Sequence, residues 1–383
     1  MAIKTIDDTH LTNIAAAIRG KNGTTNTYKP SQMAAAIDAI TTGGGADGIC
    51  LTGSLDRLFY PWSGAHYDDT WAETYYYPKF VSENTTTKDI TSLLQAFRQC
   101  TLTEIPFAIN LTTDSEVMVN YAFAESQLHR LPTISGTLGV ELGRICYNCE
   151  NLNNVDGLAN TKVFTGTKGK AQEVFFGCKS LRRVPESFLQ EAGRQPYTGS
   201  NYTFYYRTFY TDFVLDEVKN LGVSEKEYTS NTFNSTVYMC YRLKDFTFET
   251  NSDGTAKVAS WKGQTIDLTN VGTLNNSSMI TGSNSGITTD KAVTDDASYQ
   301  ALKNDPDWYA FKDDNYCRYN HDSAVNTINS LPDTSAYLAT AGGTNTVKFT
   351  GAKGALTDGG AINTLTEEEI AVATAKGWTV TLV

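Results

Sequence analysis

Six imperfect copies of one apolar pattern run through the middle of the chain. Each copy has an aromatic or apolar pair, then a small residue or Cys, then a Leu, and an Ile, Leu, Val or Phe three residues after that Leu. A repeat of 23 to 34 residues buries its apolar face only by stacking on its neighbours, so the pattern predicts a solenoid over residues 91–275. We expect a short strand around each Leu and a turn in the aromatic stretch before it. The copies are marked by Cys100, Ser126, Cys149, Cys178, Asp212 and Cys240.

Residues 1–42 carry two short apolar stripes with helical spacing. Gly20 ends the first predicted helix, and Pro30 opens the second. Each helix is too short to bury its stripe alone, so the stripes must pack on each other and on sister chains or a host assembly. The expected oligomerisation and attachment residues are Leu11, Ile14, Ile18, Met33, Ile37 and Ile40.

Two segments join this hairpin to the repeats. Residues 43–48 include three consecutive Gly, which predict a flexible hinge. Residues 49–90 combine clustered aromatic residues, short β-like runs and turn signals. We therefore expect an irregular β segment that caps the first repeat.

Residues 276–383 differ in character from the repeats and predict a C-terminal capping region. A short helix is expected near Asp322 to Ser330, and a strand at Thr346 to Thr350. The run from Thr366 to Glu369 has the form of a capping box, which opens a helix. A strand follows from Trp378 to Val383. Such a helix–strand unit suits a cap over the exposed edge of a stacked array.

Charge and composition narrow the function classes. The 42 acidic and 31 basic residues give a net charge of −11, which argues against nucleic acid and anionic lipid as partners. No apolar run approaches the roughly 20 residues of a membrane helix, and the first residues lack the pattern of an export signal. We expect the seven Cys to be free thiols, mostly buried as small hydrophobic groups. The abundant Thr, Asn, Ser and Tyr are nevertheless typical of extracellular binding proteins.

Two sets of residues resemble known families. Phe176 to Pro185 (FGCKSLRRVP) resembles the BspA-like class of leucine-rich repeats, which occur in bacterial surface adhesins and in phage structural proteins. Leu11 to Met33 is similar to the helical start of tail-associated proteins in phages and prophages of gut bacteria. Leu365 to Val383 looks like the end of many such proteins. Asp212 departs from the repeat pattern because an acid replaces the small residue of the fifth copy.

The resemblance implies an α/β fold, an irregular leucine-rich-repeat solenoid with an N-terminal two-helix hairpin and a C-terminal helix–strand cap. It implies a virion structural protein of a phage tail tip, baseplate or fibre that binds the host cell surface. By the same resemblance we expect a homotrimer that docks on other tail or baseplate proteins through residues 1–42. Synthesis in the host cytoplasm and exposure after lysis would explain the missing export signal. The alternatives are a bacterial surface adhesin or a capsid-attached fibre, with a glycan-degrading tailspike less favoured.

Catalytic and metal-binding patterns are weak. Cys146 and Cys149 form a CxxC with no second copy, and Cys149 occupies the buried repeat position. Adjacent acids such as Asp68-Asp69 point to opposite faces if they lie on a strand, so a catalytic carboxylate pair is not indicated. We therefore predict no enzyme activity, no cofactor and no metal. The four isolated histidines are His10, His66, His129 and His321.

Two aromatic clusters are the candidates for contact with a receptor or glycan. One lies in the insertion after the fourth repeat, and the other precedes the first repeat. Exposed Tyr and Trp offer flat apolar area and a polar group, which suits sugars and protein partners. Packing between repeats or subunits is the competing interpretation. The candidate residues are Tyr202, Phe204, Tyr205, Tyr206, Phe209, Tyr210, Tyr75, Tyr76 and Tyr77.

Overall fold

The computed structural model divides the chain into two compact units, Met1–Ile49 and Cys50–Val383. The predicted helical hairpin of residues 1–42 and the hinge of residues 43–48 lie outside the described residues, as do Tyr75, Tyr76 and Tyr77. The structure describes residues 49–59, 84–113, 117–139, 141–163, 169–197, 199–240, 242–269, 271, 319, 321–349 and 365–383.

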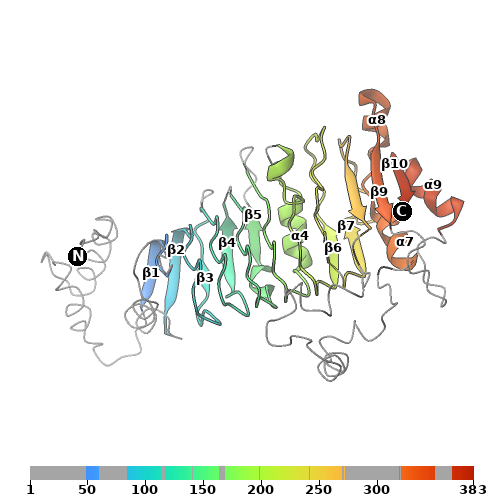
Figure 1. Cartoon of the computed structure of the whole chain (residues 1–383). Coiled ribbons are helices and arrows are strands. Elements are labelled where there is room, and N and C mark those ends of the chain that lie inside the picture. Colours follow the sequence, from blue (N-terminus) through green and yellow to red (C-terminus); the bar gives the residue numbers. More distant parts are fainter. Residues whose placement is uncertain are drawn as a thin grey trace, which may run out of the picture. The chain divides into compact units, whose positions relative to one another are not determined.

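The second unit is a succession of stacked coils, each of which contributes a short strand or helix. Every described strand pair is parallel, as expected when successive strands run in the same direction around a stack. Figure 1 shows the elements following one another in sequence order. The assignment of these coils to the leucine-rich-repeat class remains a prediction. The elements from the first coil onward are β1 (Cys50–Ser54), β2 (Thr86–Ser92), β3 (Ile109–Asn110), β4 (Ile134–Leu138), β5 (Thr161–Val163), α4 (Glu186–Gly193), β6 (Glu217–Leu221), β7 (Asp245–Phe248) and β8 (Thr265–Leu268).

Each coil bends in a tight turn that holds two residues in the left-handed backbone region, four positions apart. In the first predicted copy these residues are Gln95 and Gln99, both with a φ of 55°. Their N–H groups donate to the carbonyl oxygens of Asn120 and Ala124 in the next coil, at 3.1 and 2.8 Å. These hydrogen bonds offset the cost of left-handed backbone, about 1–2 kcal/mol for a residue other than Gly. The pair recurs at Tyr121 and Glu125, Arg144 and Asn148, Glu173 and Gly177, Arg207 and Thr211, and Ser235 and Met239.

Residues 55–59 form a further copy of this turn that the repeat pattern did not identify. Arg57 has a φ of 54°, and its N–H donates to the Leu94 carbonyl at 3.0 Å. The Phe59 ring stacks on Phe97 with 4.6 Å between ring centroids. The segment predicted as an irregular β cap over residues 49–90 therefore contains the first half of a turn of the same kind, as far as the described residues reach. Its strand β1 pairs with β2.

The strands lie where expected in only part of the array. In the fifth and sixth copies, β6 includes Val218 and β7 includes Phe246, the apolar residues that follow the marker Leu. In the first four copies no strand forms at that position. In the third copy Val155 is followed by a short 3-10 helix, Asp156–Leu158. In the other three the apolar residue is followed directly by Pro106, Pro132 or Pro185. Proline has no N–H to donate to a parallel ladder, so the strand is displaced to later residues or replaced by α4.

Like residues stack on like residues inside the coils. The rings of Phe97 and Phe123 stack at 5.5 Å, and those of Phe175 and Phe209 at 5.8 Å. A second column holds the Cys residues that mark the repeats. The thiol of each of three of them donates to a carbonyl oxygen of the preceding coil, at 2.9 Å for Cys149 and Cys240 and 3.0 Å for Cys178. The described cysteines are free, and those inside the coils are Cys100, Cys146, Cys149, Cys178 and Cys240.

The described part of the C-terminal region contains three helices and two strands, β9 and β10, that extend the sheet from β8. The predicted helix near residues 322–330 and the predicted strand near 346–350 are confirmed. β10 pairs in parallel with β9, which lies between β10 and β8. Trp378 on β10 is buried, and its Nε1 donates to the Pro332 carbonyl at 2.8 Å. The elements here are α7 (His321–Ser330), α8 (Ser335–Ala341), β9 (Asn345–Phe349), α9 (Glu367–Ala375) and β10 (Trp378–Leu382).

The capping box predicted at the start of the last helix is confirmed. The Thr366 hydroxyl accepts from the Glu369 N–H at 3.2 Å, and the Glu369 carboxylate accepts from the Thr366 N–H at 2.8 Å. Glu369 also contacts Nε2 of His321 at 3.1 Å. This contact joins the start of α9 to the start of α7. Among the described residues, no helix combines the length and apolar character needed to cross a membrane.

Asp212 occupies the Cys column as a fully buried carboxyl group. Its Oδ1 accepts from the Cys178 N–H at 2.8 Å, but its buried Oδ2 has no hydrogen-bond partner. Burial raises the pKa of Asp212 well above its usual value. The acid therefore fits the stack by remaining protonated, at the energetic cost of a buried polar atom without a partner.

Replacing Asp212 with Cys should stabilise the protein at neutral pH by about 1–3 kcal/mol, because it removes the unpaired oxygen. The new thiol lies in a column whose members already donate to the preceding coil. A carboxyl whose pKa is raised by folding destabilises the fold as pH rises above its unfolded value of about 3.9. Urea unfolding at about pH 4 and pH 7 should thus show a difference between D212C and the wild type that grows with pH. A difference independent of pH would contradict the assignment of a protonated Asp212.

Candidate binding surface

The aromatic segment at residues 202–210 divides between the core and the surface. Phe204, Tyr205 and Phe209 are fully buried, so they cannot contact a receptor, and their prediction as contact residues is corrected. The buried Tyr205 hydroxyl lies 2.9 Å from the Gly193 carbonyl and 2.8 Å from the Gly222 carbonyl. The sequence suggested that this segment is an insertion between two copies. Its second half is instead the turn of the fifth copy, with Arg207 and Thr211 in the left-handed backbone region. Its apolar positions fill the same core column as the phenylalanines of other coils.

The remaining candidates of this segment reach solvent. Tyr202 is 43% exposed, and the Lys170 ammonium lies 5.3 Å from the centre of its ring. Tyr206 and Tyr210 are half-buried. These three side chains are the part of the predicted site that the structure leaves available for contact.

Tyr210 belongs to a larger row of rings, which we call the outer ladder. Its members are stacked, with centroid separations of 4.9 Å for Tyr147 and Phe176, 4.7 Å for Phe176 and Tyr210, and 5.0 Å for Tyr210 and Tyr238. Each ring comes from a different coil and directly follows a buried residue of the core column. The separations match the 4.7–4.9 Å spacing of neighbouring strands. The outer ladder was not predicted as a unit, although the last four of the six copies have an aromatic residue at this position in the sequence.

The stacking limits what the outer ladder can bind. Rings separated by 4.7–5.0 Å cover one another's faces, so their edges point outward. Sugar stacking requires an open ring face, which the inner rings do not present. Tyr238 stands at the end of the described ladder and is 38% exposed. The ladder therefore offers ring edges and phenolic hydroxyl groups, with an open ring face possible only at its ends.

Charged side chains beside the outer ladder are paired with one another. The buried Glu173 accepts from Arg144 Nε at 2.6 Å and lies 3.8 Å from Arg207 Nη1. The guanidinium of Arg144 lies 5.4 Å from the Tyr147 ring centre, and that of Arg207 lies 5.8 Å from Tyr210. Cations over aromatic rings at these distances are favourable. One buried acid thus holds two arginines against two rings of the ladder.

The same pattern continues toward the N-terminal coils. Arg98 pairs with Glu125 at 3.1 Å and lies 5.0 Å from the Tyr121 ring centre. Arg144, from the coil after that of Tyr121, lies 5.5 Å from the centre of the same ring and contacts the Tyr121 hydroxyl. The ring of Tyr121 is therefore shared by two cations. The edge as a whole is a continuous strip of rings and neutralised charges.

Two groups of this edge, Tyr147 and Arg144, have a raised pKa. Burial, followed by the negative charge of Glu173, raises the pKa of Tyr147. Burial lowers the pKa of Arg144, but hydrogen bonds with Tyr121 and Glu173 outweigh it and leave the pKa raised. The hydroxyl of Tyr147 remains a hydrogen-bond donor, and the arginine remains a cation. Both groups therefore act here as hydrogen-bond donors.

The CxxC of the third copy lies inside the stack. Burial raises the pKa of Cys146 well above the ordinary thiol value. Burial also raises the pKa of Cys149, but hydrogen bonds with Cys146, Cys178 and Ser126 outweigh it and leave the pKa lowered. Both thiols are fully buried, whereas reactive cysteines lie in a partly exposed setting. Within the described ranges, no group of three or more His, Cys, Asp or Glu is arranged to hold a metal ion.

No protein family model matches the chain, and neither a curated protein nor a solved structure matches it.

Removing a ring from the middle of the outer ladder should weaken the fold more than removing one from its end. Phe176→Ala deletes two stacking contacts and part of the covered apolar area, so we expect a loss of about 2 kcal/mol in unfolding free energy. Tyr238→Ala deletes one ring–ring contact and should cost about 1 kcal/mol. Equilibrium urea unfolding of both variants gives the comparison. Equal losses would mean that the rings contribute by local burial and not as a ladder.

Proposed function

We propose that this chain is a non-enzymatic structural protein of a phage particle, located at the tail tip, baseplate or fibre, where it binds the host cell surface. The observation that carries the proposal is the similarity of Leu11 to Met33 to the start of phage tail-associated proteins. The repeats that follow resemble a class used in phage structural proteins and adhesins. In this proposal the N-terminal hairpin attaches to the particle, and the coils extend from it.

The geometry of the coils supports a binding role. Seven described turns, the first of them described in part, present a strip of half-buried and exposed side chains on one edge, from Arg57 to Tyr238. Such an array provides many weak contacts over a long surface. Weak contacts are sufficient when several copies act together, as in a trimer or in a particle with several fibres.

A bacterial surface adhesin is the second candidate, because the repeat class occurs in such proteins as well. A capsid-attached fibre differs from the favoured function only in its docking partner. A glycan-degrading tailspike requires a pair of catalytic carboxylates beside a cleft. Along the turns of the described coils, the half-buried Glu125 and the buried Glu173 form ion pairs with arginines, which favours binding over hydrolysis.

Mass spectrometry of purified particles from the phage or prophage that encodes this chain tests the proposal directly. We expect the chain as a stoichiometric component. The double substitution of Ile14→Asp and Ile37→Asp should reduce the oligomer to single chains in light scattering and prevent incorporation, because two charges enter the apolar stripes. Asn13→Asp, on the polar side of the first predicted helix, is the matched control and should incorporate normally. A chain found on the bacterial envelope but missing from particles would instead support the adhesin.

A further inference from the structure

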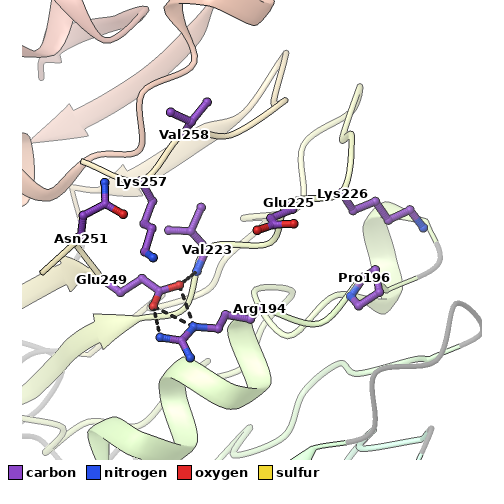
Figure 2. Close-up of a pocket in the computed structure, with 9 residues that line it drawn as sticks. All are labelled: Arg194, Pro196, Val223, Glu225, Lys226, Glu249, Asn251, Lys257 and Val258. Carbon is purple, nitrogen blue, oxygen red and sulfur yellow. Dashed lines mark hydrogen bonds and ion pairs between the residues drawn. The ribbon is translucent and has the colours of Figure 1, made fainter. Parts of the chain in front are cut away.

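A pocket of about 450 Å³ opens beside the end of α4, away from the outer ladder. Figure 2 shows its lining residues, which come from the end of α4, from the segment after β6 and from the segment after β7. A volume of this size falls in the range of small-ligand sites. The lining residues are Arg194, Pro196, Val223, Glu225, Lys226, Glu249, Asn251, Lys257 and Val258.

The floor of the pocket is fixed by a saturated ion pair. The buried Glu249 carboxylate accepts from Arg194 Nε at 2.8 Å and from the Val223 N–H at 2.8 Å. Arg194 makes a second contact through Nη2, so the pair is bidentate (Figure 2). With its acceptor sites occupied by protein donors, Glu249 is a structural element of the pocket. It holds the end of α4 against the segment after β6.

Three polar groups of the lining are not used by the fold. The Lys257 ammonium and the Glu225 carboxylate have no hydrogen-bond or ion-pair partner in the described part of the chain. Asn251 donates through Nδ2 to the Thr255 hydroxyl at 2.9 Å, which leaves its Oδ1 available. Figure 2 shows the Lys257 chain pointing toward Glu249 and the Glu225 carboxylate on the opposite side of the hollow. A cation and two acceptors thus face one small space.

These groups suit a ligand that both donates and accepts hydrogen bonds. A hydroxyl group does both, whereas a phosphate or carboxylate only accepts. The Arg194–Glu249 pair is neutral as a whole, and the Lys226 ammonium donates to the Tyr197 carbonyl. Lys257 and Glu225 then oppose each other in charge across the pocket, which favours a neutral ligand. No aromatic residue lines the pocket, so a nucleobase would find no ring to stack on. The apolar faces of Pro196, Val223 and Val258 fit the carbon–hydrogen side of a sugar ring.

We propose that this pocket binds one unit of a neutral saccharide, with Lys257, Glu225 and Asn251 bonding its hydroxyl groups. The choice of a host-surface saccharide rests on the proposed function of the chain, but the pocket chemistry is independent of it. Ligand hydroxyls are donors to Glu225 and Asn251 and acceptors from Lys257. The Arg194–Glu249 pair sets the distance between the two sides and does not itself bond the ligand.

Saturation-transfer NMR on the full chain tests the proposal with three probes: a trimer of N-acetylglucosamine, a trimer of glucose and a trimer of galacturonic acid. We expect transfer to at least one neutral trimer and weaker transfer to the galacturonate. Lys257→Met should weaken binding of that neutral trimer by about tenfold, the effect of losing one hydrogen bond to a charged group. Glu225→Gln keeps the shape and one acceptor, and should weaken binding by a smaller factor.

Lys162→Met is the matched control, because Lys162 is exposed on β5 and does not line the pocket. It should bind the neutral trimer as the wild type does. Each variant should retain the wild-type unfolding midpoint, which separates loss of the pocket from loss of the fold. The proposal is overturned if neither neutral trimer receives saturation, if only galacturonate does, or if both pocket variants bind like the control.

The outcome is separable from that of the proposed function. Saccharide binding that depends on Lys257, in a chain missing from purified particles, would preserve the pocket and remove the phage function. If the chain is present in particles but Lys257→Met does not change saccharide binding, the phage function is preserved and the proposed pocket is rejected.

Discussion

The hydrogen bonds between successive turns are the constraint on which the rest of the unit depends. In each turn the left-handed residues direct N–H groups to carbonyl oxygens of the next coil, as Gln95 does to Asn120 and Arg207 does to Asn234. This fixes neighbouring coils at the separation of paired strands, about 4.7–4.9 Å. Every side chain at one position of the turn must then stack on its equivalents. The phenylalanine column, the thiol column and the outer ladder are consequences of that single spacing.

The spacing also explains which substitutions the repeat accepts. A buried column with this separation admits flat rings or small side chains, so Cys and Ser recur at its marker position. Asp212 is accepted there because protonation removes its charge and the Cys178 N–H satisfies one oxygen. On the outer side of the turns a side chain of any size fits, but a charged side chain needs a partner of opposite charge in a neighbouring coil. Glu173 between Arg144 and Arg207 shows how one acid satisfies both neighbours.

The sequence predicted well those features that depend on local chemistry. The capping box at Thr366 and the stacked thiols follow from residue types alone, and both are present. Features that depend on competition between neighbours were missed. In the first copy the expected strand does not form at Ile105, because the following Pro106 has no N–H to donate to a neighbouring strand. The turn at residues 55–59 escaped notice because Trp62 stands at its marker position, where the other copies have a smaller side chain.

The same spacing decides where selective recognition can occur. Along the outer ladder, ring faces cover one another and the arginines are held by acids, so the four coils of the ladder offer similar contacts. Selectivity needs a place where the regular stack is interrupted and polar groups are left over. The stack is interrupted where Pro185 replaces a strand by α4, whose last turn leads into Arg194. Two coils later the segment after β7 supplies Asn251 and Lys257 opposite that helix end. The irregular coil thus creates the pocket, while the regular coils hold its walls in place.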